Sequence, residues 1–133
     1  TRSARISEAE ALQIETDAAV HVYEGLSLVD GTPIALFRSV FPAERFPAML
    51  PCLKADPSVT AALAHSGVVD YTRTSTRVNA KLATATQALH LHIAEHAPIL
   101  RTISVNADPD GCPVELGRTW FAADKVTLTL SDP

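Results

Sequence analysis

An internal repeat constrains the fold of this chain more than any other feature. The window VDGTPIALFRSVF at residues 29–41 returns as PDGCPVELGRTWF at residues 109–121. Six of the thirteen positions are identical, and Ile34 is matched by the similar Val114. A period this long that occurs only twice is not typical of a solenoid. The repeat therefore predicts one domain built from two related halves.

Each half is expected to begin with a short helix. SEAEAL at 7–12 lies over TATQAL at 84–89, an offset of 77. Ser7 and Thr84 are each followed three residues later by Glu or Gln, the signature of a capping box at a helix start.

Two strands joined by a tight turn should follow each helix. Apolar residues alternate over 20–28 and 99–105, which favours half-buried strands. An Asp-Gly pair comes next in both copies, at 30–31 and 110–111, and suits a turn that needs positive φ. The second strands are expected at 33–41 and 113–121.

Residues 42–83 connect the halves. The proline-rich segment PAERFPAMLP at 42–51 predicts an irregular loop over the core. Asp56 as N-cap and Pro57 at the first helical position predict a helix that ends at Gly67.

Two further strands are expected from composition and alternation. YTRTSTRVNA at 71–80 is rich in β-forming residues, and KVTLTL at 125–130 alternates at the end of the chain. In the first strand, Arg73 and Arg77 would share one face about 13 Å apart. Such guanidinium groups suit a carboxylate or phosphate, although an ordinary solvated face is an equal alternative.

Composition limits the classes of function. The chain has 133 residues, enough to bury about two-thirds of its unfolded surface in one domain. Its formal charge of −4 argues against binding to the phosphate backbone of a nucleic acid. No stretch approaches a membrane span and none resembles a signal peptide, so we expect a cytoplasmic protein without a membrane partner. Because the sequence does not begin with methionine, we expect a fragment or a trimmed chain.

No catalytic or metal-binding pattern stands out. His92 and His96 are four residues apart, but Pro98 disfavours a helix through this stretch, so a surface loop is preferred to a zinc site. Cys52 and Cys112 are interpreted as reduced thiols, with a single disulfide left open. Neither a nucleophile elbow nor a phosphate-cradling loop is present. We expect no cofactor and no enzyme.

Charged and polar residues on the repeated strands offer two further candidates. Glu24 and Arg101 occupy equivalent positions at the offset of 77, and could form an ion pair or simply be exposed. Glu115 shares a strand face with Thr119 and Phe121, which could line a polar pocket or form an ordinary exposed face.

The chain resembles the UTRA domain, the effector-binding half of HutC-type GntR-superfamily transcription regulators. The resemblance is carried by SEAEALQI, DGTPIALFRSVFP, DPSVTAAL, YTRTSTRVNAKLATATQALHL, APILRTISV and DGCPVELGRTWFAADKV. The run at 71–80 is most similar to the PhnF-like branch, which is linked to phosphonate and phosphate metabolism.

This resemblance implies an α+β, chorismate-lyase-like fold: an antiparallel sheet flanked by short helices. It also implies a homodimer that binds a small-molecule effector. DNA would be bound only through an N-terminal winged helix-turn-helix, which lies outside this chain. Residues 1–133 would then form a single effector-binding and dimerisation domain.

The family's sugar-phosphate sensors supply candidate ligand residues. Their acid and aromatic pair, six residues apart, falls on Glu115 and Phe121, and their helix-start serine falls on Ser58. A serine at a helix start suits an anion.

Three other positions depart from those sensors. Their two strand arginines fall on Gly25 and Ser27, and their first-half glutamate falls on Phe37. The resemblance therefore argues against an amino-sugar phosphate. For a phosphonate or phosphate, the expected donors and helpers are Arg73, Arg77, Tyr71 and Thr76.

We therefore expect a domain that senses a small anionic metabolite. Two alternatives stay open: a chorismate-lyase-like enzyme, based on fold alone, and a dimerisation module whose cleft is vestigial.

Overall fold

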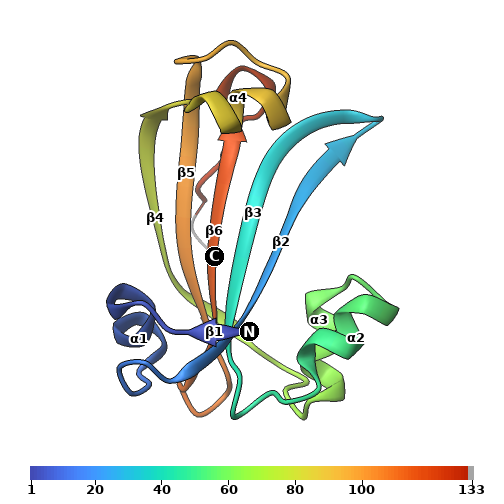
Figure 1. Ribbon diagram of the computed structural model, residues 1–133, viewed down its shortest axis with the longest axis vertical. Coiled ribbons are helices and arrows are strands. Elements are labelled where there is room, and N and C mark those ends of the chain that lie inside the picture. Colours follow the sequence, from blue (N-terminus) through green and yellow to red (C-terminus); the bar gives the residue numbers. More distant parts are fainter. Residues whose placement is uncertain (132–133) are drawn as a thin grey trace.

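The computed structural model describes residues 1–131, which form a six-stranded antiparallel sheet with short helices around it (Figure 1). In chain order the elements are β1 (Arg2–Ser3), α1 (Ile6–Leu12), β2 (Ala19–Val29), β3 (Thr32–Pro42), α2 (Met49–Ala55), α3 (Val59–His65), β4 (Thr72–Leu82), α4 (Ala85–Leu91), β5 (Pro98–Ala107), β6 (Pro113–Ala122) and the 3₁₀ turn η1 (Ala123–Lys125). The predicted α+β class is confirmed. Within the described part, no helix is long and apolar enough to cross a membrane.

The order of the strands reflects the repeat. The sheet runs β1-β2-β3-β6-β5-β4, so each half contributes an edge strand, a helix and a hairpin. The two hairpins meet at β3 and β6, which pair antiparallel in the middle of the sheet. The predicted duplication of a helix and hairpin is confirmed.

The structure confirms the predicted start of α4 but not that of α1. In α4, Thr84 Oγ1 accepts the Gln87 amide at 3.2 Å and Gln87 Oε1 accepts the Thr84 amide at 3.1 Å, as the capping box predicts. The prediction for α1 was wrong, because the helix starts at Ile6 and Ser7 lies inside it. The carboxylate of Glu8 accepts the Arg5 amide at 2.8 Å instead. The helices are thus offset by 79 residues rather than 77.

The two hairpin turns differ. Asp30 and Gly31 have φ of 50° and 78°, so the first is a tight two-residue turn, as predicted. In the second turn only Gly111 has positive φ, at 81°. There the Asp108 carboxylate accepts the Asp110 and Cys112 amides at 3.0 and 2.9 Å and organises a longer loop.

The helices divide between the two faces of the sheet. We call one the α1/α4 face: α1 packs there on a cluster that includes Val40 and Leu116, and α4 on one that includes Leu36 and Trp120. In Figure 1 these two helices lie at opposite ends of the sheet. The other is the α2/α3 face, where both helices pack against Phe41 from β3.

The middle of the chain departs from prediction in three places. The expected loop at 42–51 gives way to α2 from Met49, because Phe46 and Met49 are fully buried in the core. The next helix is capped by Ser58, whose Oγ accepts the Ala61 amide at 3.1 Å, rather than by Asp56. Residues 126–131 form no strand, although 125–130 alternate.

Strand β4 carries a bulge that changes its face assignment. Arg73 pairs with Asn106 and Ser75 with Val105, so Thr74 is an extra residue on β4. Its hydroxyl donates to the Val105 carbonyl at 3.2 Å. A bulge of this kind switches the face of every side chain beyond it.

Candidate functional site

The strand residues that face α2 and α3 form successive rows across the sheet, of which the first two are mainly polar. The rows follow from the strand register, since residues directly paired across neighbouring strands share a face. From the α2/α3 end, the first row is Arg73, Asn106 and Glu115, and the second is Thr76, Ser104, Gly117, Ser39 and Tyr23. The third is Val78, Thr102, Thr119, Phe37 and Gly25, and the fourth is Ala80, Leu100, Phe121, Ala35 and Ser27.

Most of the residues predicted to bind a ligand lie on this face. Six of them take places in the rows: Arg73, Thr76, Glu115, Phe121, Ser27 and Phe37. Two more belong to the cover of the face, because Tyr71 packs against the cluster of α2 and α3 and Ser58 caps α3.

Arg77 is the exception, and the prediction that it shares a face with Arg73 was wrong. Arg77 pairs with Ile103, whereas Arg73 pairs with Asn106, three residues further along β5. An odd separation places the two guanidinium groups on opposite faces. The bulge at Thr74 is the cause, and a bulge of one residue leaves no mark in the alternation of the sequence.

The start of α3 and the start of β4 meet at one corner of this face. The hydroxyls of Thr60 and Tyr71 are hydrogen-bonded at 2.7 Å. Ser58 caps the same helix two residues earlier. Its hydroxyl oxygen accepts the Ala61 amide, and the hydroxyl can still donate its own proton. Arg73 follows Tyr71 by two residues and begins the first row of this face, so we expect its guanidinium group near these hydroxyls.

Glu115 is held in place by a buried hydrogen bond. Asn106 Nδ2 donates to Glu115 Oε1 at 2.8 Å, and both side chains are buried. A buried carboxylate that receives one amide donor keeps further acceptor capacity for a hydroxyl or an amine. Ser104 and Ser39, from the next row, are also buried and add hydroxyl groups beside it.

Sequence reasoning missed Asn106 and Ser104. A signal existed, because Thr102, Ser104 and Asn106 alternate with Ile103 and Val105 on β5. That alternation shows a polar face, but only the register shows that this face is shared with Glu115.

Gly25 and Phe37 explain the departure from the sugar-phosphate sensors. They pair directly across β2 and β3, and a Cβ on Gly25 would lie 2.4 Å from Cζ of Phe37. The Phe37 ring, 5.4 Å from the Tyr23 ring between centroids, therefore occupies the space above Gly25. An arginine at position 25 cannot fit while this ring is present.

The histidines and cysteines are dispersed. Among the described residues, no group of three His, Cys, Asp or Glu side chains is arranged to hold a metal ion. His90 lies in the last turn of α4, and His92 and His96 adopt left-handed turn conformations. Cys52 lies on α2 and Cys112 in the second hairpin turn, both as free thiols.

Comparison with known proteins identifies the family. The family of the UTRA domain matches residues 1–127. This chain belongs to the UTRA domain family. The chorismate-lyase-like class that the resemblance implied is thereby confirmed, together with its antiparallel sheet.

Two curated relatives of this UTRA domain are transcriptional regulators. The uncharacterized HTH-type transcriptional regulator RB1450 of Rhizobium meliloti is 44% identical over 101 residues, which is 76% of this chain and 41% of that protein. The HTH-type transcriptional repressor PhnF of Mycolicibacterium smegmatis is 26% identical over 121 residues, 91% of this chain and 49% of that protein. The chain thus spans less than half the length of either relative.

A solved structure shows the same fold. The effector domain of PhnF from Mycobacterium smegmatis has a TM-score of 0.88 and 25% identity, and the match covers 96% of this UTRA domain and 78% of that chain. The resemblance to the PhnF-like branch is therefore confirmed.

Proposed function

We propose that this UTRA domain is the effector-sensing and dimerisation domain of a bacterial transcriptional regulator, and that its ligand is a small anionic metabolite. The observation that carries the proposal is that eight of the nine candidate ligand residues lie on one face of the sheet or in its cover. The similarity to PhnF supports the regulatory role.

The ligand would lie along the first two rows. Its anionic group, a phosphonate, phosphate or carboxylate, would be received at the corner by Arg73, Tyr71 and Ser58, because guanidinium and hydroxyl groups are donors for oxyanions. Its polar body would extend toward Thr76 and Glu115, whose free acceptor capacity favours a hydroxyl or an amine.

The regulatory step would follow from linkage. A ligand that binds one arrangement of a dimer more tightly shifts the population toward it, by no more than the difference in affinity. In the intact regulator this would change the spacing of two DNA-binding heads relative to operator half-sites. Those heads would lie outside residues 1–133. A homodimer can be checked by light scattering. Within the described residues, the outer edge of β4 is exposed and has no neighbouring strand, so it is one surface through which a dimer could form.

A thermal-shift screen tests the ligand class. Methylphosphonate, inorganic phosphate, glucose 6-phosphate and acetate should be compared, because a bound ligand raises the melting temperature by mass action. An active compound should lose its effect in Arg73→Ala and keep it in Arg77→Ala. These variants remove the same residue type from the same strand but from opposite faces. A shift that survives in Arg73→Ala would disprove the assignment of this face.

The vestigial-cleft alternative has one specific observation in its favour. Phe37 fills the position next to Gly25 where the family's sugar-phosphate sensors place charged contacts. If none of the four compounds raises the melting temperature of a folded dimer, the dimerisation module is the better interpretation.

A further inference from the structure

The α1/α4 face carries a row of arginines that the proposed function does not use. Register places Arg77, Ile103, Arg118, Arg38 and Glu24 side by side on β4, β5, β6, β3 and β2. The protein as a whole is acidic, with a formal charge of −4. Three arginines in one row of such a chain therefore represent a strong local excess of positive charge.

The repeat shows that one of these arginines has lost its counter-charge. Arg38 and Arg118 are the same position of the repeat. Beside Arg38 stands Glu24, whose carboxylate accepts from Arg38 Nε at 3.0 Å. The residue in the corresponding place beside Arg118 is Ile103.

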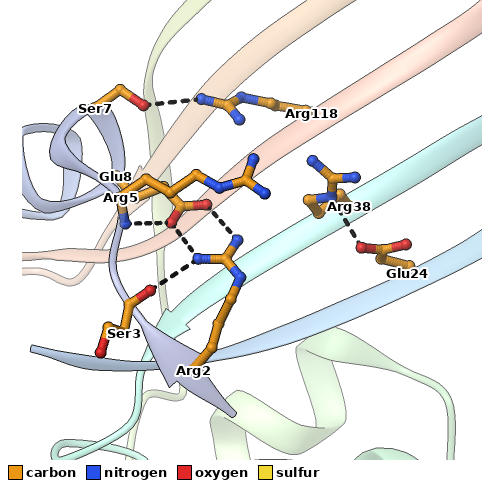
Figure 2. Close-up of polar contacts among 8 residues, drawn as sticks. All are labelled: Arg2, Ser3, Arg5, Ser7, Glu8, Glu24, Arg38 and Arg118. Carbon is orange, nitrogen blue, oxygen red and sulfur yellow. Dashed lines mark hydrogen bonds and ion pairs between the residues drawn. The ribbon is translucent and has the colours of Figure 1, made fainter. Parts of the chain in front are cut away.

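The surroundings of Arg118 do not replace the missing carboxylate. Its one hydrogen bond within residues 1–131 is a long one, from Nη2 to the Ser7 hydroxyl at 3.4 Å. The nearest acid toward α1, Glu8, is already held by two bonds from Arg2 at 2.7 and 2.9 Å (Figure 2). Among the described residues, Arg118 forms no salt bridge.

Further positive charge converges on the same place. Figure 2 shows the Arg5 side chain extending from the start of α1 toward Arg38. Arg101, one row away, donates from Nη2 to Asn79 at 3.2 Å, but its buried Nε has no partner within the described residues. Burial is the largest effect on Arg118 and lowers its pKa. The charge of Glu8 opposes this lowering, and the individually smaller effects of Arg38, Arg101 and Arg5 add to it.

A cavity opens beside this cluster. It measures about 520 Å³ and lies between α4 and the middle of β2 and β3. Arg38 and Trp120 line one side of it, with the Arg38 guanidinium 5.5 Å from the centre of the Trp120 ring. Gln87 and His90 of α4 line another side. A smaller cavity of about 210 Å³ lies on the other side of Trp120, next to Arg101.

We propose that the α1/α4 face holds a second ligand site, which binds a doubly charged oxyanion with a flat apolar body. The phosphate or phosphonate group would lie between Arg118 and Arg38, within reach of Arg5, and the body would enter the cavity against Trp120. Arg38 uses only Nε for Glu24, so its terminal nitrogens remain available to an oxyanion. A dianion fits better than a monoanion because several neighbouring guanidinium groups must be neutralised together.

The fluorescence of Trp120 reports on this site, because it is the only tryptophan of the chain and lies on the α1/α4 face. The intact chain should be titrated with phenylphosphonate, with inorganic phosphate as the charge without the ring, and with benzoate as the ring with a single charge. We expect a saturable change with phenylphosphonate and at least tenfold weaker binding of the other two. Equal binding of benzoate, or no saturable change, would overturn the proposal.

Variants localise the response. Arg118→Gln should weaken phenylphosphonate binding at least tenfold, while the control Lys54→Gln, which removes an exposed positive charge on α2 outside both sites, should change it by less than twofold. Ile103→Glu supplies the carboxylate that the second half of the repeat lacks and leaves every arginine in place, and it should cause a similar loss. A response that both folded variants retain belongs to another site, and the proposal is then wrong.

Discussion

Arg38 and Arg118, which are the same residue in the two copies of the repeat, stand directly opposite each other on β3 and β6. Along two antiparallel strands, the residue numbers of each facing pair add up to the same total. Two positions related by the repeat can therefore face each other at only one place, the centre of symmetry between the strands. The approximate two-fold axis of the domain therefore passes between these two side chains. A duplicated hairpin joined in this way forces two like charges together in the middle of the sheet.

This arrangement should cost stability, because like charges directly opposite each other are destabilising. Arg118→Gln should raise the free energy of unfolding by about 0.5–1 kcal/mol in low-salt buffer without phosphate. The gain should shrink as salt screens the charges. Chemical denaturation at two salt concentrations measures both effects. Arg73→Gln is the control for removing one positive charge and should lie within about 0.5 kcal/mol of the wild type. Destabilisation by Arg118→Gln would show that the arginine is already neutralised.

The contact between Gly25 and Phe37 gives a second prediction. Gly25→Ala places a methyl group where the Phe37 ring now lies, at 2.4 Å from Cζ. We expect a loss of about 1–3 kcal/mol, the usual cost of overpacking. In a Phe37→Ala background the same glycine substitution should cost much less, because the ring is gone. A double-mutant cycle of urea denaturation midpoints measures this coupling. Additive effects would show that the cost of Gly25→Ala does not come from contact with the Phe37 ring.

The repeat predicted most of the fold because hairpins and helix starts are local. The Asp30-Gly31 turn and the Thr84 cap depend on residues a few positions apart, and both were identified correctly. The start of α1 was not, because Glu8 forms its bonds with Arg2 and with the Arg5 amide rather than as part of a serine capping box.

The candidate site was less accessible to sequence reasoning. Which face a strand residue occupies depends on register, and the extra residue Thr74 reversed the side of Arg77 relative to Arg73. The pairing of Glu24 shows the same limitation. It binds Arg38 across the hairpin, whereas the offset of 77 had matched it with Arg101. A two-residue error in alignment had therefore suggested an ion pair with Arg101 as one possibility, whereas Arg101 donates to Asn79.

The two helix starts provide a matched test of the caps. Thr84→Ala removes the acceptor of the Gln87 amide and should destabilise the domain by about 0.5–2 kcal/mol. Ser7→Ala, which the sequence pattern alone would rank as equivalent, should change stability by less than about 0.5 kcal/mol, because Ser7 lies inside α1 and is exposed. Thermal denaturation of both variants compares them directly. Equal losses would contradict the assigned start of α1.

The buried carboxylate of Glu8 predicts a specific dependence of stability on pH. Its side chain is fully buried, and the hydrogen bonds from Arg2, with the Arg5 amide as a further donor, lower its pKa from 4.5 to about 2. A carboxyl group whose pKa is lower in the folded state stabilises that state fully at pH values above its unfolded pKa. The contribution then disappears as the pH falls from about 4.5 toward 2. This contribution to the free energy of unfolding is roughly 3 kcal/mol at neutral pH.

Glu8→Gln should therefore be destabilised by about that amount at pH 7. The difference in the free energy of unfolding between Glu8→Gln and the wild type should narrow steadily below pH 4.5. Glu24→Gln is the control, since its ion pair with Arg38 is largely exposed and should contribute less than about 1 kcal/mol. Urea denaturation from pH 7 to pH 3 measures both differences. A Glu8→Gln penalty that stays constant over this range would show that packing of the side chain, rather than its charge, stabilises the start of α1.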